Sequence, residues 1–186
     1  VFPLPHVPST IKTPGARANY LALHYWDLYD FSNNELIGNK DISEQGFSNF
    51  ISIMPYVTQR EEAFETLVAR MASNSKMTSY FVALAEKYLS EPLSPVYNED
   101  LYLLMLDKVV ACKDLSALDK EEYKFDLKMA HKNRIGTKAA NFTYFCRNGV
   151  SGKLWDIRGG EYVLLLLGDP DCNICVETKD QLAASA

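Results

Sequence analysis

Two cysteines separated by two residues, Cys172 and Cys175, carry the clearest chemical signal in the sequence. This spacing lets one helical turn bring the two sulfur atoms together, so that a disulfide can form and reopen. The first sulfur is expected at a helix N-terminus, where unpaired N–H groups and the helix dipole favour the thiolate. We therefore predict that Cys172 is the attacking thiol and that Cys175 resolves the mixed disulfide.

The same pair could instead be half of a zinc site or a structural disulfide. A structural zinc site takes four ligands, and the sequence has no second C-x-x-C and no histidine pair at ligand spacing. We therefore expect no metal and no cofactor. The remaining cysteines fit simpler interpretations, since Cys112 falls near a helix end as a small buried side chain and Cys146 lies in an expected strand.

An apolar segment precedes the cysteine pair. Residues Val163–Leu167 are continuously apolar and are bounded by Gly160 and Gly168, a pattern typical of a strand buried on both faces. A short turn over residues 169–171 follows, and then a polar segment with helical character. Strand, turn, C-x-x-C and helix is the order of elements in a thioredoxin-like active site.

A β-hairpin is expected before this strand. Residues Phe142–Arg147 alternate in polarity, and Asn148-Gly149 is a strong signal for a two-residue hairpin turn. The second strand is predicted over Lys153–Ile157. These elements begin at about Ala139, where the apolar period changes from that of a helix to that of a strand.

Upstream, apolar residues recur at helical spacing, which indicates packed core rather than a cofactor site. The helical segments are separated by three predicted helix starts: a capping box at Thr58–Glu61, an N-cap at Ser75 and a start at Asn98. Gly136 signals the end of the last helix. The last helix carries Phe125 and Met129 in its apolar stripe. We expect helices over about residues 16–30, 47–54, 58–71, 75–91, 98–112 and 118–133.

One pair in the first helix invites an acid–base interpretation. His24 and Asp27 are three residues apart, so their side chains can hydrogen-bond on one helical face. No nucleophile accompanies them, and a structural histidine is the preferred interpretation. The helical region also contains no Gly-rich phosphate loop and no metal-ligand cluster.

Composition excludes several classes of protein. With 186 residues and 47% hydrophobic side chains, the chain can bury a substantial core. A net charge of −5 argues against binding to nucleic acid or to an anionic membrane surface. The longest apolar run is far shorter than the about 20 residues needed to span a bilayer.

The segment from Ala139 onward resembles the beginning of a TlpA-like thioredoxin domain, in which a hairpin leads to a buried strand and an active-site C-x-x-C. The residues that carry this resemblance are Ala140–Phe142, Asn148-Gly149, Tyr162–Leu167 and Cys172–Cys175. The resemblance implies thiol–disulfide exchange with a protein thiol or disulfide as substrate. Asp171 replaces the usual tryptophan and Asn173-Ile174 the usual Gly-Pro, which leaves the redox potential and the direction of electron flow open.

The helical part resembles a domain of unknown function that precedes thioredoxin-like domains in bacterial envelope proteins. The motifs that match are Tyr25–Asp27 with Asp30-Phe31, Lys87–Glu99 and Asn133–Ala139. This resemblance implies a location in the bacterial periplasm or cell envelope. Because the chain begins at Val1, we expect that a signal sequence has been removed.

We predict a mainly α fold: a bundle of about five or six helices followed by a β-hairpin, a buried strand and the first helix of an incomplete thioredoxin-like α/β domain. The expected divisions are an extended leader (1–15), a helical domain (16–136) and the N-terminal part of the thioredoxin-like domain (137–186). A thioredoxin fold needs roughly a hundred residues, so we expect the chain to stop partway through it. An apolar strand left unpaired at 163–167 predicts association between copies.

Two functions remain open. In the first, the parent protein is an envelope thiol–disulfide oxidoreductase, the helical domain docks its partners, and this chain alone is inactive. In the second, the helical region is a non-enzymatic binding or interaction module for an unknown ligand.

Overall fold

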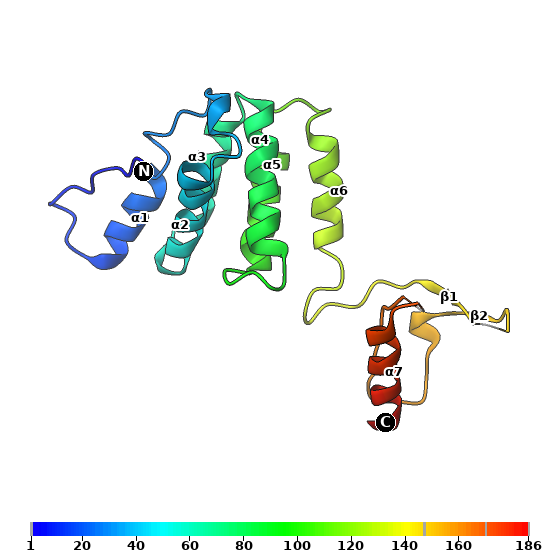
Figure 1. The fold of residues 1–186 in the computed structure, drawn as a ribbon. Coiled ribbons are helices and arrows are strands. Elements are labelled where there is room, and N and C mark those ends of the chain that lie inside the picture. Colours follow the sequence, from blue (N-terminus) through cyan, green and yellow to red (C-terminus); the bar gives the residue numbers. More distant parts are fainter. Residues whose placement is uncertain (1, 147, 170, 186) are drawn as a thin grey trace. The chain divides into compact units, whose positions relative to one another are not determined.

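The computed structural model describes residues 2–146, 148–169 and 171–185. Arg147 of the predicted first strand and Pro170 of the predicted turn lie outside these residues. The chain divides into two compact units, Val1–Ala139 and Ala140–Ala186. Over the described residues it is mainly helical, with seven α-helices and one two-stranded antiparallel hairpin, which confirms the predicted class (Figure 1). No helix in the described part of the chain is long and apolar enough to cross a membrane.

The first unit is a bundle of six α-helices. Helix α3 packs against α1, α4 and α5, and α6 packs against α5, so the helices stand in a row (Figure 1). A π-helical turn precedes α2 (Lys40–Glu44) and another follows α4 (Glu86–Ser90). The helices are α1 Pro14–His24, α2 Gln45–Ile53, α3 Arg60–Met71, α4 Ser75–Ala85, α5 Glu99–Ala111 and α6 Lys120–Ala130.

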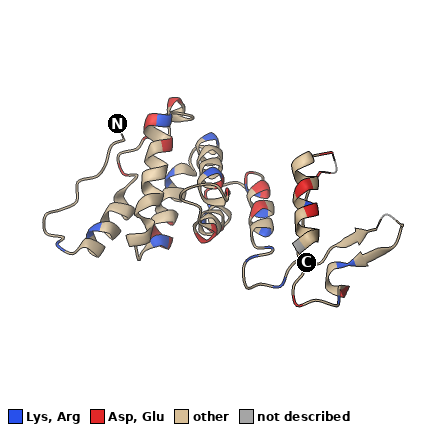
Figure 2. Cartoon of the chain, turned by 60° about the horizontal axis from the view of Figure 1, so that its bottom comes forward, with Lys and Arg blue, Asp and Glu red and all other residues tan. Residues whose placement is uncertain are grey.

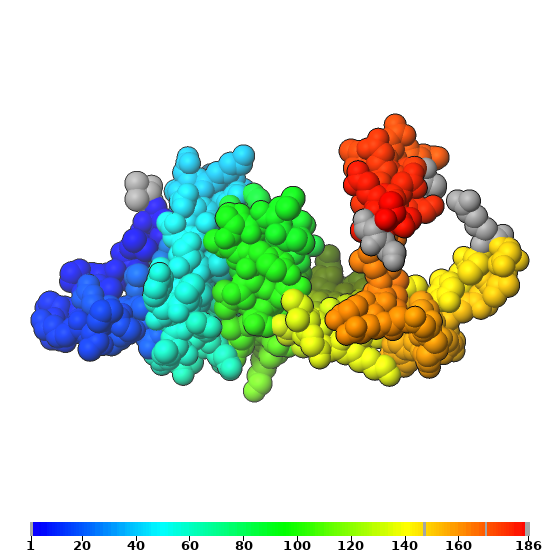
Figure 3. All heavy atoms as spheres, turned by 90° about the horizontal axis from the view of Figure 1, so that it is seen from below, coloured from blue at the N-terminus to red at the C-terminus, as the bar shows by residue number. Residues whose placement is uncertain are grey.

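Aromatic side chains form the centre of this bundle. Trp26 is fully buried, and its ring lies 5.1–5.9 Å from six others. Four of these six contacts are edge-on, an arrangement that the charge distribution of aromatic rings favours, and the other two are tilted. In the space-filling view, the bundle from α1 to α5 is a continuously packed body (blue to green in Figure 3). The neighbours of Trp26 are Phe2, Tyr25, Tyr29, Phe31, Phe50 and Phe81.

The Pro-rich leader is attached to the bundle by Phe2. Its ring is buried, stacks on Tyr25 at 4.9 Å and meets Trp26 edge-on. Gly46, in the first turn of α2, makes room for this ring, because a Cβ atom added there would lie 2.3 Å from Cδ2 of Phe2. The leader therefore contributes a core side chain as well as an extended segment.

Helix starts depend on more than the local motif. Asn98 caps α5 as predicted, since its side chain accepts a hydrogen bond from the Leu101 N–H at 3.1 Å. The capping box predicted at Thr58 is wrong, because the hydroxyl and backbone N–H of Thr58 bind the side-chain amide of Asn19 in α1. The cap predicted at Ser75 is also wrong: Asn74 caps α4 and additionally donates to the Phe31 carbonyl oxygen.

Helix α6 faces the core with a different side from the one predicted. Tyr123 is buried and shares a hydrogen bond with Ser79 of α4, with Leu127 packed against the core beside it. Phe125 is 62% exposed and Met129 is 44% exposed. The prediction was wrong because α6 has apolar residues on two faces, and periodicity alone does not say which face meets α5.

The second unit begins with the predicted hairpin. Strand β1 (Thr143–Phe145) pairs antiparallel with β2 (Ser151–Lys153), with Tyr144 opposite Gly152. Gly149 in the connecting turn has φ +81°, a conformation that glycine adopts without steric cost. The second strand, predicted over Lys153–Ile157, lies earlier: it ends at Lys153, and a 3₁₀ turn (Leu154–Asp156) follows in place of the predicted strand.

The buried strand predicted at Val163–Leu167 is wrong. The segment has no strand structure and its side chains are 46–95% exposed. A strand buried on both faces needs neighbouring strands and covering side chains. In the described part of the chain, β1 and β2 pair only with each other, so the segment runs to the last helix, α7 (Asn173–Ser185), as an irregular connection.

We predict that Gly46→Ala destabilises the bundle by about 1–3 kcal/mol, because the added methyl group displaces the Phe2 ring from the core. Gly15→Ala, in the first turn of α1, is the matched control, since its added Cβ meets no atom within 4 Å. Urea denaturation of both variants measures the difference. Equal midpoints for the two variants would mean that Phe2 does not occupy this position.

Candidate functional site

A tight turn presents the cysteine pair. The Asp171 N–H donates to the Asp169 carboxylate at 2.9 Å, and the Cys172 N–H donates to the Asp169 carbonyl oxygen at 3.1 Å. The Val176 N–H then donates to the Cys172 carbonyl oxygen at 3.1 Å. Cys172 therefore occupies the N-cap position of α7, where the peptide N–H groups of the first turn have no partner within the helix.

The first turn of α7 brings the two thiols together. The Cys175 N–H donates to Sγ of Cys172 at 3.4 Å, both side chains are half-buried, and both are free thiols. The hydrogen bond from the Cys175 thiol lowers the pKa of Cys172, and the backbone N–H groups of Cys175 and Ile174 lower it further against a smaller effect of burial. Cys172 is thus the thiol whose nucleophilic form is stabilised.

Gly168 belongs to this site, although sequence reasoning treated it only as the boundary of a strand. An added Cβ at Gly168 would lie 3.2 Å from Cβ and 3.5 Å from Sγ of Cys175. The backbone of the preceding segment therefore approaches the second thiol closely. A glycine just before a C-x-x-C turn is the only sequence signal for this contact.

The other two cysteines have different surroundings. Cys112 follows α5, where its N–H donates to the Lys108 carbonyl oxygen at 3.0 Å, and its side chain packs against the core of the helical unit. Cys146 follows β1 and is exposed, with its N–H donating to the Val150 carbonyl oxygen at 2.7 Å. In the described residues, no group of three or more His, Cys, Asp or Glu side chains is arranged to hold a metal ion.

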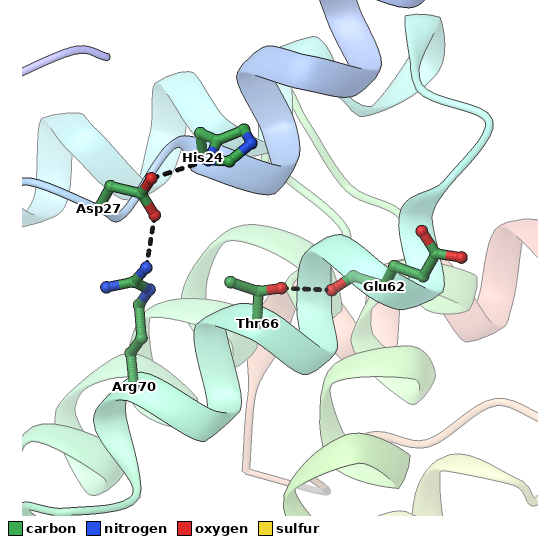
Figure 4. Close-up of polar contacts among 5 residues, drawn as sticks. All are labelled: His24, Asp27, Glu62, Thr66 and Arg70. Atoms are coloured by element: carbon green, nitrogen blue, oxygen red, sulfur yellow. Dashed lines mark hydrogen bonds and ion pairs between the residues drawn. The ribbon is translucent and has the colours of Figure 1, made fainter.

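A second polar cluster lies in the helical unit (Figure 4). Nδ1 of His24 is 2.8 Å from one carboxylate oxygen of Asp27, as their spacing predicted, and Nη2 of Arg70 donates to the other at 2.5 Å. Arg70 comes from α3, 43 residues away, and no local pattern signals it. All three side chains are at least one-third exposed. The Asp27–Arg70 contact links the residues after α1 to α3, and the nearby Thr66 hydroxyl donates to the Glu62 carbonyl oxygen within α3.

Charged side chains of both signs are interspersed along the helices (Figure 2). This distribution accompanies the modest net charge of −5. It differs from the basic stripe by which nucleic-acid-binding proteins are recognised.

Comparison with known families assigns the helical unit. A domain of unknown function, DUF5106, matches residues 1–133. The chain belongs to this family. The crystal structure of a thioredoxin-like protein from Bacteroides caccae is also similar, with 36% sequence identity and a TM-score of 0.69. The match covers 98% of this chain and 66% of that one, so the DUF5106 chain spans about two thirds of its relative. No curated protein matches the chain.

We predict that Cys172 reacts with iodoacetamide at neutral pH faster than Cys175, because its lowered pKa gives it a larger thiolate fraction. The rate at Cys172 is expected to exceed that of a free cysteine at neutral pH and to approach it at alkaline pH, where a free thiol is also ionised. Mass spectrometry of partly alkylated protein measures both rates. Cys175→Ala should slow the alkylation of Cys172 about threefold, because the thiolate loses one hydrogen bond. An unchanged alkylation rate would contradict the hydrogen bond from Cys175 as the cause of the lowered pKa.

Proposed function

We propose that this chain is part of a TlpA-like thiol–disulfide oxidoreductase, with Cys172 as the nucleophile and Cys175 as the resolving thiol. The observation that carries the proposal is the hydrogen bonding of the Cys172 sulfur by Cys175 at the start of α7. The likeness to a protein described as thioredoxin-like supports it, since that match extends over nearly all of this chain.

The exchange proceeds in two balanced steps. The Cys172 thiolate attacks one sulfur of a substrate disulfide, a Cys172–substrate disulfide forms, and the departing substrate thiolate takes up a proton. The Cys175 thiolate then attacks Sγ of Cys172 and expels the second substrate thiolate. The substrate disulfide is thereby reduced and the Cys172–Cys175 pair oxidised, and the reverse sequence oxidises a substrate dithiol.

The activity is assigned to a longer protein, because this chain spans only about two thirds of the length of the thioredoxin-like relative. We place it in the bacterial periplasm or cell envelope, with a protein thiol or disulfide as the substrate, and we expect the chain alone to be inactive. The DUF5106 unit would then dock the substrate protein.

A second function is favoured by a cavity in the helical unit. About 400 Å³ of space lies between the leader, α1 and the 3₁₀ turn Met54–Tyr56, and its lining is mainly apolar. Volume and lining are in the range of small-molecule sites. The alternative is therefore a non-enzymatic binding module. The lining residues are Val7, Pro14, Gly15, Arg17, Ala18, Leu21, Ile53 and Tyr56.

An equilibrium titration with reduced and oxidised glutathione tests the redox proposal. We expect Cys172 and Cys175 to interconvert between dithiol and disulfide at a potential within the about −270 to −120 mV of known exchangers. Thiol-alkylating mass tags report the state, and Cys172→Ser with Cys175→Ser is the control. A pair that never closes leaves the binding module as the better account.

We also propose that residues 163–167 mediate association between copies, because five consecutive exposed aliphatic side chains form an apolar surface. Leu164→Lys with Leu166→Lys is expected to lower the average mass at high concentration, since the charges remain solvated only in the separated chains. Light scattering after size exclusion measures the mass. A wild-type chain that stays monomeric in the concentrated sample contradicts this proposal.

A further inference from the structure

The turn that presents the cysteine pair carries two acidic side chains. Asp169 closes the turn with its carboxylate and its carbonyl oxygen, and Asp171 comes directly before Cys172. Asp171 is exposed, and in the described residues no hydrogen bond or ion pair holds its carboxylate. Consecutive Cα atoms are about 3.8 Å apart, so this carboxylate lies within about 10 Å of the Cys172 sulfur. A negative charge therefore lies beside the atom that a substrate disulfide must approach.

No basic residue close in the sequence offsets these charges. Residues 159–178 contain four acidic side chains and no lysine or arginine. Arg158, the last basic residue before this stretch, donates to backbone carbonyl oxygens at the adjacent 3₁₀ turn. Lys179, the first one after it, lies seven residues beyond Cys172, about 10 Å further along the axis of α7. The charges closest to the thiol along the chain are thus negative.

The two aspartates do not activate the thiol. Hydrogen bonds from the Cys175 thiol and from backbone N–H groups lower the pKa of Cys172, whereas a neighbouring carboxylate opposes the formation of a thiolate. The charge of the aspartates acts instead on the molecule that approaches the sulfur, because opposite charges speed an encounter and like charges slow it. Their effect is therefore expected in the choice of substrate.

We propose that Asp169 and Asp171 make Cys172 selective for substrate disulfides whose cysteines are flanked by lysine or arginine. The inference rests on the proposed thiol–disulfide exchange and adds a chemical class of substrate to it. A cationic side chain next to the substrate cysteine comes close to both carboxylates when the sulfur atoms meet, whereas an acidic one is repelled. Asp171 is expected to contribute more, because the Asp169 carboxylate already accepts a hydrogen bond inside the turn.

Small disulfides of defined charge test the proposal, because they need no docking surface and can exchange with the 186-residue chain. The probes are cystamine, which is cationic, dithiodiglycolate, which is anionic, and hydroxyethyl disulfide, which is neutral. The Cys172 thiolate attacks one probe sulfur, the S–S bond of the probe breaks, and one probe thiolate leaves and takes up a proton. In a Cys175→Ser background the mixed disulfide persists, so mass spectrometry of the peptide that contains Cys172 gives the rate of this step.

The measured quantity is the cystamine rate divided by the dithiodiglycolate rate at about 10 mM salt, where screening is weak. Comparing this ratio between variants cancels the intrinsic reactivity of each probe and any change in the thiolate fraction. Asp171→Asn keeps the backbone N–H that closes the turn and is expected to lower the ratio about threefold. Asp180→Asn is the matched control, because the same change of charge lies eight residues after Cys172, about 12 Å along α7.

The outcomes separate this inference from the function on which it rests. A decrease that is confined to Asp171→Asn and disappears in about 1 M salt assigns the preference to this carboxylate. A ratio that Asp171→Asn lowers no more than Asp180→Asn does overturns the inference, while the exchange itself is retained. A Cys172 thiol that exchanges with none of the three probes, the neutral one included, overturns the proposed function and the inference with it.

Discussion

The burial of Trp26 among six other aromatic rings is the interaction on which the helical unit depends. The rings come from the leader, from the residues that follow α1, from α2 and from α4, so one cluster fixes segments that are distant in the sequence. Large aromatic side chains dominate core energetics because each removes a large apolar area from water. Loss of this cluster would detach the leader, and with it one wall of the apolar cavity.

The cysteine site depends on a different kind of constraint. It is built within a few residues: Asp169 closes the turn, and the backbone of α7 positions Cys175 against the sulfur of Cys172. Such a site needs a helix start and little else to bring its thiols together. Reactivity toward a protein substrate needs more, namely a surface that binds the substrate.

Sequence reasoning was accurate where local chemistry decides the structure. Asn98 caps α5 because its own side chain reaches the Leu101 N–H, and Asn148-Gly149 turns the hairpin because glycine accepts a positive φ. It was wrong where a distant partner decides. Thr58 binds Asn19 in place of its own helix, α6 buries Tyr123 in place of Phe125, and residues 163–167 lack neighbouring strands. The His24–Asp27 contact followed from spacing, whereas Arg70 was unpredictable because it lies 43 residues away.

The two tryptophans of the chain lie in different units and in different surroundings. Trp26 is fully buried in the helical unit, and Trp155 is 43% exposed in the 3₁₀ turn after the hairpin. Their fluorescence is therefore separable, with the emission of Trp26 shifted to the blue by its apolar environment. A chain that keeps only one of them carries a built-in optical reporter for a single unit, so the cooperativity of unfolding between the two units can be followed without any added label.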